Sequence, residues 1–246
     1  MAKMLKMKRI YGLIAAVTTK YPEDPFFKDF EKSCMTIEEK RACYKIYENA
    51  LQELDEQSWQ ILKDKAVKNF IDLRGKSKKV FNLLNEAFAY SFLVQSGCTG
   101  ITMLSESSER GVCTPDIQYV ESGQIKHCEV KTLGISNEEI DRREKLSVFD
   151  GIYSKLGDGF FKKLDNDIKA AKAQVATKGT SGLVYLVVNF DDLALDYYSE
   201  YKQQIISYCR DKNIHGLHIH QIDLCRNCHI TIPYNYEGDN KENIKK

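Results

Sequence analysis

PDIQYVESGQIKHCEVKTL, residues 115–133, is the stretch that decides the fold. Segments 116–120 and 125–133 are rich in residues that strands prefer, and Ser122-Gly123 between them are turn residues. This arrangement predicts two antiparallel strands joined by a two-residue turn. A tight β-hairpin is therefore expected near the middle of the chain.

The register of this hairpin brings two acidic side chains together. With a two-residue turn, Glu121 faces Gln124. Five residues further from the turn, Asp116 then lies opposite Glu129, and period-two alternation places Lys131 on the same face as Glu129. Directly opposed strand residues have Cβ atoms about 4.5–5.5 Å apart, where like charges are destabilising. The pair therefore suggests a bound divalent cation that offsets the repulsion.

The segments around the hairpin predict an α/β fold, with a sheet of mixed direction flanked by helices. Thr36-Ile37-Glu38-Glu39 fits a capping box that starts a helix. Apolar periodicity predicts helices over 36–54, 57–73, 77–97, 160–178 and 196–212. Strands are expected over 100–104, 183–190, 216–221 and 228–232, and the unbroken apolar run at 183–190 is typical of a central strand.

Glu86 stands out in the predicted helix 77–97. This helix is apolar almost all round, which is typical of a buried helix. A carboxylate in such surroundings needs a partner or a metal ion. A structural contact to a backbone group or to a neighbour such as Arg74 is the alternative, and the sequence leaves both interpretations open.

The residues at the hairpin suit metal-assisted cleavage of a phosphodiester. Magnesium takes oxygen ligands and is commonly held by one or two carboxylates. Asp116 and Glu129 supply that pair, and the Val130 carbonyl lies close enough to complete one face. Lys131, next to the cation and the phosphate, could orient or activate the attacking water and stabilise the charge that develops.

Pro115-Asp116 followed by Glu129-Val130-Lys131 resembles the PD-(D/E)xK nuclease superfamily. The resemblance extends more loosely over about half of the chain, from the Glu86 helix to the strand near residue 190. It implies a restriction-endonuclease-like α/β core, a Mg²⁺ (or Mn²⁺) cofactor, and hydrolysis of DNA in restriction, repair or recombination, with RNA as another candidate substrate.

The same resemblance implies roles for individual residues. Asp116 and Glu129 would bind the metal with the Val130 carbonyl, and Lys131 would assist the water. Glu86, on the helix before the hairpin, would join the metal site. Gln174, on the helix after it, would face the same site.

Two other interpretations remain open. Glu129 and Lys131 could form an ordinary salt-bridged strand surface, with Asp116 a turn residue after proline. The fold could also have lost catalysis and act as a nucleic-acid-binding or zinc-stabilised interaction module.

The predicted helix 160–178 carries the candidate contacts to nucleic acid. A net charge of +1 gives the whole molecule no strong field, so a local basic surface must hold the phosphates. Lys162, Lys163 and Lys169 are the candidates. Lys163 is favoured because it shares a helical face with Gln174.

A second group of residues suggests a structural zinc site. Cys225 and Cys228 are spaced as in zinc-binding pairs, and His218 and His220 alternate onto one face of the strand upstream. Zinc prefers such nitrogen and sulfur ligands in a tetrahedral set. Two half-buried thiols are the alternative interpretation.

Composition bounds the class and location of the protein. Its 246 residues are 43% apolar and 29% charged, and its eight cysteines are scattered, which favours reduced thiols and a cytoplasmic location. No apolar stretch approaches membrane-spanning length, so no membrane partner is expected.

We expect a helical N-terminal extension (1–75) for recognition or dimerisation, a nuclease-like core (76–236) and a disordered tail (237–246). A homodimer is a reasonable expectation, because paired cuts in a duplex need two active sites.

Overall fold

A computed structural model describes residues 6–70, 79–107, 113–133, 155–189, 197–222 and 227–232. Within these ranges the side chains of residues 79, 189, 198, 222, 227 and 228 are left out of the description. The predicted tail and most of the segment between the hairpin and the next helix lie outside the described residues.

Six strands in the described ranges form one open, mixed sheet, which confirms the predicted α/β class. Their order follows the sequence: β1 (Thr99–Met103), β2 (Ile117–Glu121), β3 (Gln124–Leu133), β4 (Gly182–Asn189), β5 (Leu217–Ile222) and β6 (Asn227–Ile232). The pairs β3–β4 and β4–β5 are parallel, and the other neighbours are antiparallel. The buried β4 therefore lies between two parallel partners, as its apolar run predicts.

The β2–β3 hairpin has the predicted register. Glu121 pairs with Gln124, and Ile117 pairs with Cys128. Ser122 and Gly123 have φ values of 52° and 75°, the left-handed geometry that both central residues of a type I′ turn require. The turn chemistry thus determines which residues of the two strands face one another.

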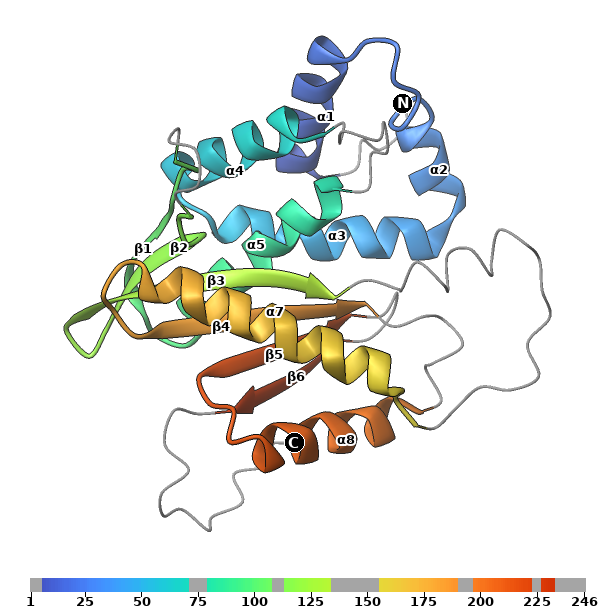
Figure 1. Ribbon diagram of the computed structural model, residues 1–246. Coiled ribbons are helices and arrows are strands. Elements are labelled where there is room, and N and C mark those ends of the chain that lie inside the picture. Colours follow the sequence, from blue (N-terminus) through green and yellow to red (C-terminus); the bar gives the residue numbers. More distant parts are fainter. Residues whose placement is uncertain are drawn as a thin grey trace.

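Helices cover both faces of the sheet (Figure 1). On one side of the sheet, α4 (Glu56–Lys68) and α5 (Lys79–Gln95) contact the strands, and α3 (Glu38–Glu53) packs on α5. On the same side, α1 (Lys8–Lys20) packs on α3 and α4, and α2 (Phe30–Thr36) packs on α3. On the opposite face lie α7 (Asp158–Ala176), which crosses in front of β3 and β4, and α8 (Tyr198–Asp211). Among the described helices, none is long and apolar enough to cross a membrane.

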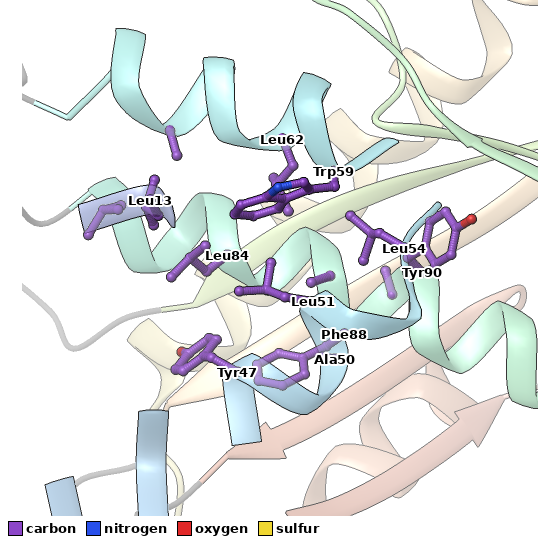
Figure 2. Packing of buried hydrophobic residues seen from close by; sticks show 14 of the residues in the cluster. Leu13, Tyr47, Ala50, Leu51, Leu54, Trp59, Leu62, Leu84, Phe88 and Tyr90 are labelled. Carbon is purple, nitrogen blue, oxygen red and sulfur yellow. The ribbon is translucent and has the colours of Figure 1, made fainter. Parts of the chain in front are cut away.

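The N-terminal helices share their core with α5 and the sheet. Figure 2 shows Trp59 and Leu62 of α4 near Leu51 of α3 and Leu84 of α5, with Phe88 of α5 beside Tyr47 of α3. The same buried cluster continues to sheet residues of β2, β3 and β4. The predicted domain boundary at residue 75 lies outside the described residues, but the helices before it are packed into the core after it.

The capping-box prediction at Thr36 is wrong. The Thr36 hydroxyl donates to the carbonyl of Lys32, 3.0 Å away, and also lies 3.3 Å from that of Ser33. Thr36 therefore ends α2, and Ile37 takes the N-cap position of α3 without a side-chain cap. The hydroxyl is used by the preceding helix and cannot serve the following one.

Candidate metal centre

Asp116 lies immediately before β2 and reaches across to β3. Its backbone N–H donates to the carbonyl of Cys128 at 3.1 Å, and its Oδ2 accepts from the backbone N–H of Val130 at 2.9 Å. The side chain thus takes the place of the next backbone partner in the β2–β3 ladder. This contact holds the carboxylate against the middle of β3.

The Val130 carbonyl faces the same side of β3 as Asp116. In an antiparallel ladder a residue directs its N–H and its C=O to the same neighbouring strand. The N–H of Val130 points to Asp116, so its carbonyl points to that side as well. Because β2 begins only at Ile117, this carbonyl lies beyond the end of the β2 ladder.

Glu129 is almost fully buried in the middle of β3, with 2% of its surface exposed. Its Oε1 accepts from Lys131 Nζ at 2.6 Å. Among the residues that the structure describes, no hydrogen-bond donor reaches the buried Oε2. A buried carboxylate oxygen without a partner is costly, and a hard cation would satisfy it.

Lys131 and Gln174 meet beside Glu129. Gln174 lies near the C-terminal end of α7, and its Nε2 donates to the backbone carbonyl of Thr114 at 2.7 Å. That bond turns its Oε1 towards Lys131 Nζ, 3.4 Å away. The structure therefore brings the predicted residue Gln174 into contact with the predicted Lys131 and with the loop that precedes Asp116.

Glu86 contacts a lysine that the sequence analysis missed. On α5, its Oε2 lies 2.9 Å from the ammonium of Lys65, which comes from α4 and is 7% exposed. The same ammonium lies 3.4 Å from Asp116 Oδ1. Lys65 follows Ser58 and Leu62 at helical spacing on the buried side of α4. A lysine on that stripe is the signal that could have identified it.

Burial and the crowding of acidic groups shift the titration of these side chains. Burial raises the pKa of Glu86 and of Glu129, and the nearby Asp116 charge raises both further. Burial alone would lower the pKa of Lys65, but the Glu86 and Asp116 charges outweigh it and hold that pKa above its ordinary value. Lys65 therefore stays an ammonium ion.

The carboxylates are held by ammonium and backbone groups rather than gathered around one point. In the described part of the chain, no three His, Cys, Asp or Glu side chains form a ready metal site. Magnesium commonly needs only one or two carboxylates, with water filling the other positions. Asp116, the Val130 carbonyl and the Glu129 oxygen that lacks a donor among the described residues supply the kind of ligands that this smaller set needs.

The predicted nucleic-acid contacts lie along the exposed side of α7. Lys163 pairs with Asp167 at 2.9 Å, and Lys169 pairs with Asp165 at 2.6 Å. Lys163 lies eleven residues before Gln174, about 16 Å along the helix axis. Lys162 is exposed on the same helix. Such exposed ion pairs are weak, so these ammonium groups are free to exchange partners, and phosphate binding by them stays a prediction.

The predicted zinc ligands are only partly described. Cys225 and the side chain of Cys228 lie outside the described residues. His218 and His220 share one face of β5, as predicted; Nδ1 of His220 lies 3.0 Å from the Tyr185 hydroxyl, and Nε2 of His218 lies 3.1 Å from Nδ1 of His229.

These three histidines line a cavity of about 550 Å³ between the sheet and helices α3 and α5. Burial is the main reason that the pKa of His218 is lowered to about 3, and the nearby His229 and His220 contribute to the lowering. The imidazole is therefore neutral, as a metal ligand must be. Zinc binding here stays a prediction, because Cys225 and the Cys228 side chain lie outside the described residues.

Comparisons with protein-family models, with curated proteins and with solved structures find no match to this chain. The resemblance to PD-(D/E)xK nucleases thus stays a prediction carried by Asp116, Glu129 and Lys131.

Proposed function

We propose that this protein is a Mg²⁺-dependent nuclease that hydrolyses phosphodiester bonds of DNA, with a restriction-endonuclease-like core. One observation carries the proposal. Asp116, Glu129 and Lys131 lie together at the end of the β2–β3 hairpin away from its turn, and Glu129 keeps a buried oxygen without a hydrogen-bond partner among the described residues. That oxygen fits a hard cation better than any uncharged neighbour would.

Each residue of the centre would have its own role in phosphodiester cleavage. Asp116, Glu129 and the Val130 carbonyl would hold the metal ion. When bound, magnesium supplies positive charge for the scissile phosphate and lowers the pKa of a coordinated water. Lys131, held between Glu129 and Gln174, keeps an ammonium group beside that position, where it orients the water and stabilises negative charge on the phosphate.

A plasmid-cleavage assay with Mg²⁺ tests this proposal. We expect wild-type protein to cut, and Asp116→Asn and Lys131→Ala to lose about 10²-fold or more of the rate, because each removes a group that acts at the phosphate. The matched controls are Glu121→Gln and Lys126→Ala, an acid–base pair at the turn end of the same hairpin. Glu121 lies about 16 Å along the strand from Asp116, and Lys126, which faces Tyr119, lies about 10 Å along it, so both controls should keep wild-type activity.

Each result has a defined meaning. Equal cutting by wild type, Asp116→Asn and Lys131→Ala would point to a contaminating nuclease and end the proposal. DNA binding without cleavage by the wild type, in Mg²⁺ or Mn²⁺, would favour the non-catalytic nucleic-acid-binding module. Cleavage of RNA alone would retain the chemistry and correct the substrate.

A further inference from the structure

We infer that the Lys65 ammonium takes the place of a second metal ion, so that the candidate centre holds a single divalent cation. This inference rests on the proposed metal site and adds a positioning residue to it. It also changes the role of Glu86, which becomes the counter-ion of Lys65 rather than a metal ligand.

The first argument is the position of Lys65. Asp116 contacts Lys65 through Oδ1 and the Val130 backbone through Oδ2, so it stands between Lys65 and β3. In two-metal centres the ions lie about 3.5–4 Å apart, commonly on either side of shared oxygen ligands. Lys65 contacts Asp116 from the side on which Glu86 lies. The other side of Asp116 faces β3, which carries Glu129 and its oxygen without a donor among the described residues. One cation position is thus already filled by protein.

The second argument is that burial holds the Lys65 side chain in this position. It is 7% exposed and lies on the face of α4 that is buried with Trp59, Leu62 and Ala66. The helix start is fixed as well, because the Asp55 side chain accepts from the backbone N–H of Ser58 at 2.7 Å. Moving the ammonium away would leave Glu86 buried without its partner, which is strongly unfavourable.

The third argument is the charge balance of the connected side chains. When all five groups are in their charged forms, three carboxylates (Glu86, Asp116 and Glu129) and two ammonium groups (Lys65 and Lys131) leave one net negative charge at this centre. One divalent cation reverses that charge to a single positive one, which suits a phosphate. A second divalent cation would leave three net positive charges in a buried site, which is unfavourable.

Counting bound Mn²⁺ tests the inference on the full chain without DNA. Calorimetric titration gives the number of ions, and the electron paramagnetic resonance spectrum shows whether two ions lie close enough to couple. We expect one Mn²⁺ for wild type and two, with a coupled spectrum, for Lys65→Met. The double variant Lys65→Met/Glu86→Gln, which removes the lysine and its counter-ion together, should return to one.

Glu86→Gln provides a second arm that does not depend on the folding of the Lys65 variant. Because Glu86 acts only through Lys65, we expect this variant to keep one Mn²⁺, with affinity lowered by no more than about 100-fold. Loss of Mn²⁺ binding in Glu86→Gln would show that Glu86 is a ligand and would overturn the inference.

The remaining outcomes separate this inference from the proposed function. Two ions in wild type, or one ion with unchanged affinity in folded Lys65→Met, overturn the role of Lys65 and leave the nuclease proposal standing. One ion in wild type with no cleavage of any nucleic acid leaves the role of Lys65 and removes the nuclease. No Mn²⁺ in wild type overturns both.

Discussion

Glu129 shows how a single residue of this centre is held in an unfavourable state. Its carboxyl is buried in the sheet next to Asp116, and burial is the larger of the two causes that raise its pKa to about 8. Lys131 opposes the rise, but one carboxylate oxygen still has no donor within the described residues. A side chain with this environment is stabilised by a proton or by a cation.

The pH dependence of stability should report this state in metal-free protein. The ordinary pKa of glutamate is 4.5, and that of Glu129 in the fold is about 8. Between these values the folded protein keeps a proton that the unfolded chain releases, so Glu129 lowers stability as the pH rises through that window. We therefore expect Tm in EDTA to fall less steeply from about pH 5 to about pH 8 for Glu129→Gln than for wild type.

The control for this experiment is Glu121→Gln, an exposed glutamate of the same hairpin. It should keep the wild-type dependence of Tm on pH. If the plots of Tm against pH for wild type and Glu129→Gln run parallel, the raised pKa of Glu129 is contradicted.

At the scale of the elements, the close pairing of β3 and β4 helps to bury Glu129 in the sheet, with Lys131 partly exposed beside it. Gly182 at the start of β4 pairs with His127 of β3. A Cβ atom on Gly182 would overlap the backbone carbonyl of His127 and press on the side chain of Val175 in α7. Glycine is therefore needed here because two backbones and a helix meet, and not because of an unusual φ.

Gly182→Ala should destabilise the protein by roughly 1–3 kcal/mol, because β4 must move away from β3 to admit the methyl group. Urea unfolding followed by circular dichroism measures the loss. Gly159→Ala is the matched control: it lies in α7, and beyond its chain neighbours and its own helix backbone no atom of the described residues lies within 4 Å of the added methyl carbon. It should be neutral or stabilising by up to about 1 kcal/mol, as expected for alanine in a helix. Equal unfolding midpoints for the two variants would refute this account of Gly182.

At the scale of the whole molecule, the N-terminal helices belong to the same folded unit as the sheet. Leu13, Leu51 and Leu62 lie in the buried cluster that also holds Leu84 and Phe88 of α5. A hydrogen-bonded chain runs from Tyr47 through Asn85 to Thr132 and links α3, α5 and β3. Together with Lys65, these contacts make the helices part of the core and of the candidate centre.

A chain that begins at residue 76 should therefore fail to fold cooperatively. Removing the N-terminal helices exposes the α5 face that they bury and leaves Glu86 without Lys65, and both changes are costly. Thermal unfolding by circular dichroism and the hydrodynamic radius of the truncated chain provide the measurement. A sharp transition at the Tm of the full chain would show instead that residues 1–75 are a separable extension.

Much of the architecture could be predicted because its signals are local. The turn residues Ser122 and Gly123 determine the hairpin register, and apolar patterns located β4 and helices α3, α4, α5, α7 and α8 to within a few residues. Helices α1 and α2 were not predicted individually. The capping box failed because two helices meet at Thr36 and the pattern does not say which of them uses the hydroxyl. Such competition is decided by packing of α2 and α3, which the four-residue pattern does not contain.

The sequence by itself determined the sheet pairing that sets Asp116 against β3, with Glu129 and Lys131 two residues apart on one face of that strand. Alternation and turn geometry are properties of neighbouring residues, so they can be read along the chain. Only the tertiary structure decided that Lys65 joins Glu86 and Asp116, which lie 21 and 51 positions away. The physical reason is that helix packing, and not any short-range pattern, selects which buried cation compensates which buried carboxylate.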